Sequence, residues 1–155
     1  MANTKTLTAS NIRYLLTMKE LGRADGGARC IDIAAALKLS KPSVHNMMDS
    51  LSRSGLVCKN AYGMVYFTDA GRAAAERYAR YYSAVASMLA RNFPNAADLR
   101  DAACLLLAEI PDEDLEDYVR EVANLPERTL SDDPRNKDEQ REAQRRSPEK
   151  EGKTS

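Results

Sequence analysis

The chain has 155 residues, of which 43% are hydrophobic, with one histidine and three cysteines. This length suffices for one domain or for two small ones that share a core, and no apolar run approaches the roughly 20 residues of a membrane span. Cys30, Cys58 and Cys104 form no CxxC pair, and one histidine leaves little for zinc binding or acid–base catalysis. We therefore expect no enzyme, no disulfide framework and no structural zinc site.

The net charge of zero hides an uneven distribution. Residues 1–91 carry 13 Lys and Arg against 6 Asp and Glu, a net charge of +7, and residues 92–155 carry 10 against 17, a net charge of −7. A basic half is typical of a protein that binds an anionic partner such as nucleic acid, although chance clustering of surface charge is the alternative. The first residues lack the apolar segment of a signal peptide, so we expect a cytoplasmic protein without a membrane partner.

Helical signals open the chain. Apolar residues recur at helical spacing over residues 8–21 and 31–37, and the glycines between these segments predict a loop. Ser40 is placed to cap a third helix, Pro42 fits its first turn, and Gly55 predicts its end.

The periodicity changes after the third helix. Residues 56–58 and 64–67 are short β-type runs, and the turn-forming residues between them predict a hairpin. Three helices followed by a two-stranded hairpin is the order of a winged helix-turn-helix, in which the third helix enters the major groove and the hairpin, or wing, lies beside it. We therefore predict a winged helix-turn-helix DNA-binding domain over residues 8–75.

The following segment is helical again. The pattern predicts a long helix over 69–91, a second over 96–108 behind a capping box, and a last helix that starts at Pro111. We predict a mainly α fold with an all-helical dimerisation domain over 76–126. Residues 127–155 are expected to be a disordered polar tail, because they contain too few apolar groups to offset chain entropy.

The third helix has two distinct faces. Its apolar residues, spaced i, i+3, i+4 and i+7, are Val44, Met47, Met48 and Leu51. They predict a stripe that packs on the core. The predicted DNA contacts of the opposite face and the wing are Lys41, Ser43, His45, Asn46, Arg53, Lys59 and Tyr62. Basic side chains suit phosphates, and Ser43, His45 and Asn46 suit base edges. A plain solvated face is the alternative, which the acidic Asp49 favours.

The long helix carries an apolar and aromatic stripe typical of a core or a dimer seam. The predicted dimer-interface residues are Tyr78, Tyr81, Tyr82, Val85, Met88 and Leu89. Dimerisation suits a DNA-binding module, because two-fold symmetry doubles its contacts. We expect a homodimer that binds a palindromic operator in double-stranded DNA and acts as a repressor.

Several segments resemble a known family. Residues 33–47 are IAAALKLSKPSVHNM, 51–57 are LSRSGLV, 67–72 are FTDAGR, and 103–113 are ACLLLAEIPDE. Over roughly residues 8–125 the chain resembles the diphtheria-toxin-repressor family of iron- and manganese-dependent repressors. The resemblance implies a winged helix, a helical dimerisation domain and transcriptional repression. The family's third, SH3-like domain has no counterpart here, where the polar tail stands.

The family's metal ligands are mostly replaced. The corresponding positions hold Arg13, Leu16, Tyr81, Val85, Arg100, Leu107 and Ala108. Cys104 alone survives as a ligand type, and one thiolate without partners cannot form the family's site. We therefore expect no metal ligands, no cofactor and no metal switch; manganese or iron would need a site outside the family's pattern. Glu109 is expected to pair with Arg13 or Arg100.

Two other functions stay open at this point. The first is a protein-interaction module that keeps the winged helix as a scaffold. The second is a metal- or redox-responsive repressor that uses Cys30, Cys58 and Cys104. Binding to DNA that weakens steeply with salt favours the regulator over the interaction module.

Overall fold

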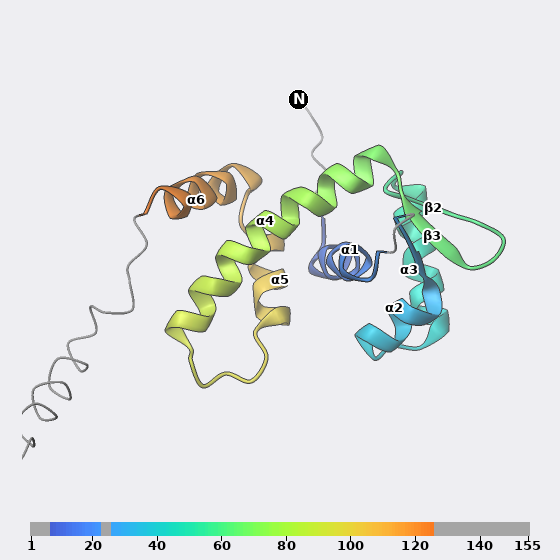
Figure 1. Cartoon of the computed structure of the whole chain (residues 1–155), viewed down its shortest axis with the longest axis horizontal. Helices are drawn as coiled ribbons and strands as arrows, with labels where there is room; N and C mark the ends of the chain where they lie inside the picture. The colour runs from blue at the N-terminus through green and yellow to red at the C-terminus, as the bar shows by residue number, and fades with distance from the viewer. Residues whose placement is uncertain (1–6, 23–25, 126–155) are drawn as a thin grey trace, which may run out of the picture. The chain divides into compact units, whose positions relative to one another are not determined.

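The computed structural model describes residues 7–22 and 26–125. The elements of this part are, in chain order, α1 (Ala9–Leu21), β1 (Gly27–Arg29), α2 (Cys30–Leu37), α3 (Lys41–Arg53), β2 (Val57–Lys59), β3 (Met64–Phe67), α4 (Asp69–Asn92), α5 (Arg100–Glu109) and α6 (Asp112–Asn124) (Figure 1). They confirm the predicted mainly α fold with a winged helix-turn-helix followed by helices. No helix of this part is long and apolar enough to cross a membrane.

The chain clusters into two units, residues 1–122 and 123–155. The predicted polar tail over 127–155 lies outside the described residues. The predicted boundary between residues 75 and 76 falls inside α4, which is continuous from Asp69 to Asn92. The division into a DNA-binding and a dimerisation domain therefore stays a prediction.

Helix α1 lies at the centre of the first unit. Thr8 caps it, because its Oγ1 accepts the N–H of Asn11 at 3.2 Å. Ile12 and Leu15 are fully buried, and the helix packs against α2, α4 and α5. One hydrophobic cluster therefore joins the helix-turn-helix to the later helices.

The predicted two-stranded wing is present, and a third strand extends it into a three-stranded antiparallel sheet. Its order is β1-β3-β2, with Gly27 opposite Tyr66 and Val57 opposite Phe67. Strand β1 lies in the segment where the glycines predicted only a loop. A segment of three residues that begins at Gly27, directly after Gly26, carries no strand signal. Strand β1 exists because β3, far along the chain, supplies its hydrogen-bond partners.

The wing joins α4 at a tight junction. Thr68 donates a hydrogen bond from Oγ1 to the carbonyl of Gly55 at 2.6 Å and accepts the N–H of Gly71 at 3.0 Å. At Gly71 the backbone passes so close to the preceding loop that an added Cβ would lie 1.7 Å from the carbonyl oxygen of Leu56. Only glycine fits there, and this contact sets where the wing ends relative to α4.

We expect Gly71→Ala to lower the free energy of unfolding by about 2 kcal/mol or more, because the backbone of Leu56 would have to move. The matched control is Gly63→Ala, where the added Cβ meets open space and only the positive φ of 73° is strained. That variant should lose about 1 kcal/mol. Urea unfolding monitored by circular dichroism measures both; equal losses would contradict the close packing.

The aromatic stripe of α4 lies inside the chain. Tyr78, Tyr81 and Val85 are at most 2% exposed and Leu89 is 8% exposed, within one core that includes buried residues of α1 and α5. In Figure 1, α1 and α5 both lie along α4, in agreement with their packing contacts. This corrects the predicted dimer seam for these four residues, because α1 and α5 of the same chain cover them. The remaining two residues, Tyr82 and Met88, are half-buried against the same core.

The helix after α4 begins later than predicted. The pattern placed its start at residue 96 behind an Asn95 cap, but α5 begins at Arg100. Asp98 supplies the hydrogen bond instead, since its Oδ1 accepts the N–H of Arg100 at 2.9 Å. The reason is local, because the Asp98 carboxylate is only two residues from the Arg100 amide and can accept its hydrogen bond.

Two tyrosine hydroxyls link α4 to α6. Tyr78 donates to Asp112 and Tyr81 donates to Glu116, each at 2.9 Å. Arg77 lies 3.4 Å from Asp112, so an ion pair joins the two helices in addition to the two hydrogen bonds. Burial, followed by the acceptor carboxylates, raises the pKa of both phenols to about 12.

These bonds predict a loss of stability at alkaline pH. Because the pKa of each phenol is about 12 in the folded chain and ordinarily 10.0, the bonds stabilise the fold fully below pH 10, and this contribution is lost as pH rises toward 12. Each phenol should contribute on the order of 1–2 kcal/mol. Urea unfolding at neutral pH and near pH 11 measures the loss, which should be smaller in Tyr81→Phe. An equal decline in that variant would contradict the assignment.

Candidate nucleic-acid interface

Helix α3 is positioned by the turn that precedes it. Lys38 ends α2 in the left-handed region with φ of 54°, and Ser40 caps α3 by accepting the N–H of Ser43 at 3.3 Å. Pro42 lies in the first turn, where its missing N–H leaves no donor unpaired. The predicted capped and proline-started helix is confirmed, and its N-terminal half leaves the turn in a defined direction.

The buried face of α3 matches the predicted stripe. Val44, Met48 and Leu51 are at most 1% exposed, and Met47 is half-buried. Helix α3 packs against α2 and β2 through these residues. The opposite face must therefore point to solvent, since residues at this spacing share one side of a helix.

All the predicted contacts of that opposite face are exposed. They are Lys41, Ser43, His45, Asn46 and Arg53, together with Lys59 and Tyr62 of the wing. One of them is already engaged: the Ser43 hydroxyl lies 2.8 Å from the hydroxyl of Ser40. A hydroxyl keeps further hydrogen-bonding capacity, so Ser43 stays available to a phosphate or a base edge.

An ion pair ties the wing to α3. The Lys59 ammonium of β2 donates to the Asp49 carboxylate of α3. This hydrogen bond holds the pKa of Asp49 below its ordinary value, and nearby Arg53 and His45 act in the same direction. The pair neutralises the one acid of the exposed face, but it also withdraws Lys59 from the phosphates it was predicted to contact. The sequence pattern could not predict this contact, because Asp49 and Lys59 are ten residues apart and lie on a helix and a strand, where periodicity does not indicate which side chains meet.

The tip of the wing is built around Asn60. Its side-chain oxygen accepts the N–H groups of Tyr62 at 2.9 Å and Met64 at 3.0 Å, and Gly63 adopts a positive φ of 73°. The turn therefore has a definite shape rather than being an open loop. It leaves the Tyr62 side chain 91% exposed at the point farthest from the core.

Two arginines occupy positions that hold metal ligands in the family that this sequence resembles. Arg13 of α1 pairs with Asp101 of α5 at 3.1 Å. Arg100 of α5 pairs with Glu20 of α1 at 3.1 Å and donates to the Thr17 hydroxyl at 3.4 Å. Both ion pairs join the same two helices: in the first the arginine belongs to α1 and the acid to α5, and in the second the arginine belongs to α5 and the acid to α1. They join α1, which packs on the helix-turn-helix, to α5.

These partners correct the expected pairing with Glu109, which lies at the C-terminal end of α5. The remaining family positions hold the buried Leu16, Tyr81, Val85 and Leu107 and the half-buried Ala108. Among residues 7–22 and 26–125, no group of three or more His, Cys, Asp or Glu side chains is arranged to hold a metal ion.

The three cysteines are free thiols. Cys30 and Cys104 are buried, and burial raises the pKa of both thiols. Protonated, buried thiols are poor nucleophiles and poor redox sensors. Cys58 is exposed on β2 and lies 3.7 Å from the carbonyl of Tyr66. A redox-responsive repressor, one of the alternatives left open by the sequence, would therefore have one accessible thiol, Cys58, rather than three.

The fold and this surface define a winged helix-turn-helix protein, the class to which many DNA-binding regulators belong. The IclR helix-turn-helix domain matches residues 13–61, roughly a third of the chain, which covers α1 to β2. No curated protein matches the sequence significantly.

Solved structures share the fold at low identity. The hypothetical protein SSo2273 from Sulfolobus solfataricus is 23% identical, with a TM-score of 0.53 over 77% of this chain and 92% of its own. IdeR of T. acidophilum is 20% identical (TM-score 0.56, 72% and 53% covered), and the metal-dependent transcriptional regulator MtsR is 18% identical (TM-score 0.61, 74% and 54% covered). The chain thus spans about half the length of IdeR and MtsR. This likeness in fold agrees with the resemblance found in the sequence motifs.

Proposed function

We propose that this chain is a sequence-specific DNA-binding transcriptional regulator that acts as a homodimer and represses by occupying its operator. The observation that carries the proposal is the row of exposed polar side chains on α3, which lies opposite the buried Val44, Met48 and Leu51 and beside the wing. A helix held in this way fits the major groove, and the IclR helix-turn-helix match supports the same use of α1 to β2.

The roles of the individual side chains follow from their chemistry. Lys41 and Arg53 contact phosphates on either side of the groove, while His45 and Asn46 reach base edges. Asn46 can make the bidentate pair with adenine. Tyr62, at the wing tip, contacts the backbone or the minor groove.

The homodimer needs a surface other than the stripe of α4, which is buried. Of the large apolar side chains outside the helix-turn-helix, Phe93, Leu105 and Leu125 are more than half exposed, at 56%, 57% and 62%. We propose that two copies meet through this later part of the chain, which leaves both α3 helices free for two half-sites. Sedimentation velocity should give twice the chain mass of 17.2 kDa; a monomer at all concentrations would remove the dimer from the proposal.

The direct test is selection of duplexes from a random pool, followed by titration over a range of salt. We expect a two-fold symmetric sequence and an affinity whose logarithm falls by about 0.9 for each phosphate contacted per decade of salt. Weak binding without sequence preference or salt dependence would favour the protein-interaction module instead.

We also propose that no transition metal gates this regulator. The crossed pairs Arg13–Asp101 and Arg100–Glu20 support this, because two guanidinium groups stand where the resembling family places metal ligands. A fixed cation repels a divalent ion, and the neighbouring positions offer apolar side chains instead of ligands. The ion pairs themselves join α1 to α5, a connection that a bound metal would otherwise supply.

Metal removal is therefore expected to leave DNA binding unchanged. Operator affinity measured with chelator, with added manganese and with added iron should agree within about twofold, which is below the usual size of an allosteric coupling. A rise of about tenfold with either metal would overturn this part of the proposal and indicate a site elsewhere in the chain. Native mass spectrometry after metal addition provides an independent count of bound ions.

A further inference from the structure

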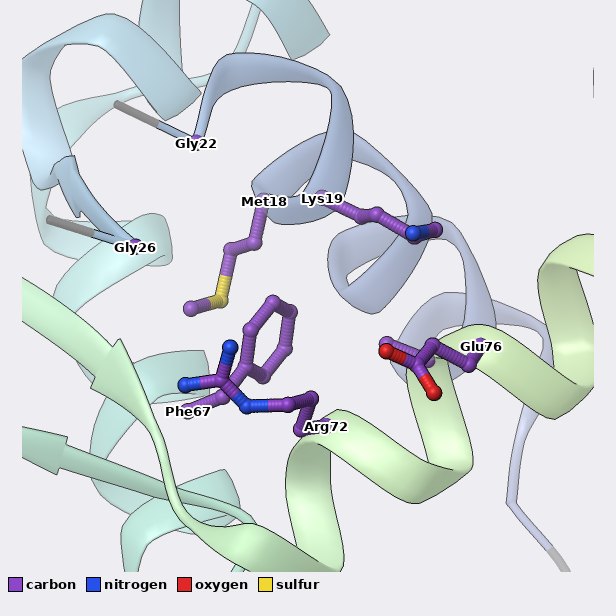
Figure 2. A pocket seen from close by; sticks show the side chains of 8 residues that line it. Met18, Lys19, Gly22, Gly26, Phe67, Arg72 and Glu76 are labelled. Carbon is purple, nitrogen blue, oxygen red and sulfur yellow. The ribbon is translucent and has the colours of Figure 1, made fainter. Parts of the chain in front are cut away.

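A pocket lies between α1 and the base of the wing, apart from the candidate DNA interface. Its volume is about 180 Å³, and its walls include Met18, Lys19, Phe67, Arg72, Ala75 and Glu76 (Figure 2). An apolar cavity of roughly 150 Å³ accommodates a benzene molecule. The space therefore suits a ligand with one six-membered ring or an aliphatic chain of similar volume.

The inner walls of the pocket are apolar. Met18 and Ala75 are each 1% exposed, and Phe67 is half-buried against the core. Figure 2 shows the Met18 thioether beside the Phe67 ring at the centre of the pocket. Small-molecule sites commonly combine such apolar walls with a few polar groups that orient the ligand.

The polar groups of the pocket favour an anion. The Arg72 side chain extends toward Met18 and Phe67, while the head groups of Lys19 and Glu76 lie on the opposite side of the opening (Figure 2). Within residues 7–22 and 26–125 the Arg72 guanidinium forms no ion pair, whereas six other cations of this part do. Two cations face one carboxylate, and a guanidinium presents paired N–H donors that match a carboxylate.

We propose that this pocket binds a small monocarboxylate with an apolar body of about benzoate size. The carboxylate lies on Arg72, and the apolar body packs between Met18 and Phe67. Phe67 ends β3 of the wing and Met18 belongs to α1, so a bound ligand bridges the wing base and the core. Any effect of the ligand on operator affinity rests on the proposed function, whereas the binding itself does not.

Titration of the full chain with sodium benzoate tests the proposal, with the methionine methyl signals followed by NMR. We expect a saturable shift of the Met18 methyl signal and none for Met88, which lies near the other end of α4. Benzyl alcohol, the neutral analogue, should bind at least about tenfold more weakly, because it lacks the charge that Arg72 would pair with.

Three charge variants then separate a specific site from general attraction. Arg72→Gln should weaken benzoate binding about tenfold, Lys19→Gln should weaken it less, and Glu76→Gln should strengthen it about twofold to fivefold. All three side chains are exposed, so the variants should fold, which circular dichroism checks. Absence of a saturable Met18 shift, or equal affinity in Arg72→Gln and Glu76→Gln, would overturn the proposal.

The two proposals fail separately. If benzoate shifts the Met18 signal but the protein selects no duplex, the proposed function is wrong and the proposed ligand site stands. If the protein binds an operator but benzoate does not shift the Met18 signal, the proposed ligand site is wrong and the proposed function stands. Where both hold, benzoate is expected to change operator affinity in the wild type and not in Arg72→Gln.

Discussion

Replacing both Lys41 and Arg53 with alanine is expected to weaken operator binding on the order of a hundredfold at physiological salt. Both side chains are exposed on the face of α3 opposite the buried stripe. A homodimer loses four cations in this variant, so the slope of log affinity against log salt should fall by about 3.6. Fluorescence anisotropy with a labelled operator at several salt concentrations measures both quantities. The loss should be the same for unrelated sequences, because phosphates carry no sequence information.

Two further variants complete this test. Arg91→Ala removes one positive charge from an exposed position in the last turn of α4, away from α3, and should change affinity little. Asn46→Ala should leave the salt slope unchanged and relax specificity at one base position by about 1–3 kcal/mol. If Lys41, Arg53 and Asn46 can all be replaced without effect on the selected complex, α3 does not face the DNA.

Replacing Asp49 with asparagine is expected to tighten operator binding about tenfold and to steepen the salt dependence. Asp49 lies on the exposed face of α3, where its charge opposes the phosphates, and it holds the Lys59 ammonium. The variant removes one negative charge per subunit and releases one cation for the DNA backbone. In a dimer the slope should increase in magnitude by about 1.8, for two newly available lysines.

A double-mutant cycle shows whether Lys59 is the source of the gain. Lys59→Ala in the wild-type background should weaken binding, because it leaves the Asp49 carboxylate facing the phosphates without its counterion. In the Asp49→Asn background, the same substitution should remove most of the improvement. A tenfold loss of affinity in Asp49→Asn, with the variant still folded, would mean that this carboxylate accepts a hydrogen bond from a cytosine amino group instead.

The helix-turn-helix could be predicted because its signals are local. Ser40 caps α3 through an amide three residues away, and Pro42 needs only the free first turn. The apolar spacing of Val44, Met48 and Leu51 determines which side of the helix is buried, whatever element covers it. For the same reason the exposure of the opposite face followed from the pattern.

The aromatic stripe of α4 shows where this reasoning ends. Periodicity states that Tyr78, Tyr81 and Val85 must be covered, but it does not state by what. The structure covers them with the chain's own α1 and α5, and Tyr81 donates its hydroxyl hydrogen to Glu116 of α6, 35 residues away. A dimer seam and an intramolecular core leave the same pattern on one helix.

What the sequence determined by itself is therefore the set of helices, the capped start of α3, the hairpin, and the polar face that α3 would present. Each depends on residues within a few positions of one another, whose side chains meet in any fold that keeps the helix. The tertiary structure alone decided the strand β1, the Asp49–Lys59 pair, and the crossed pairs of Arg13 and Arg100 between α1 and α5. Those contacts join elements that are distant or differently oriented along the chain, and only the packing of the core brings their partners within reach.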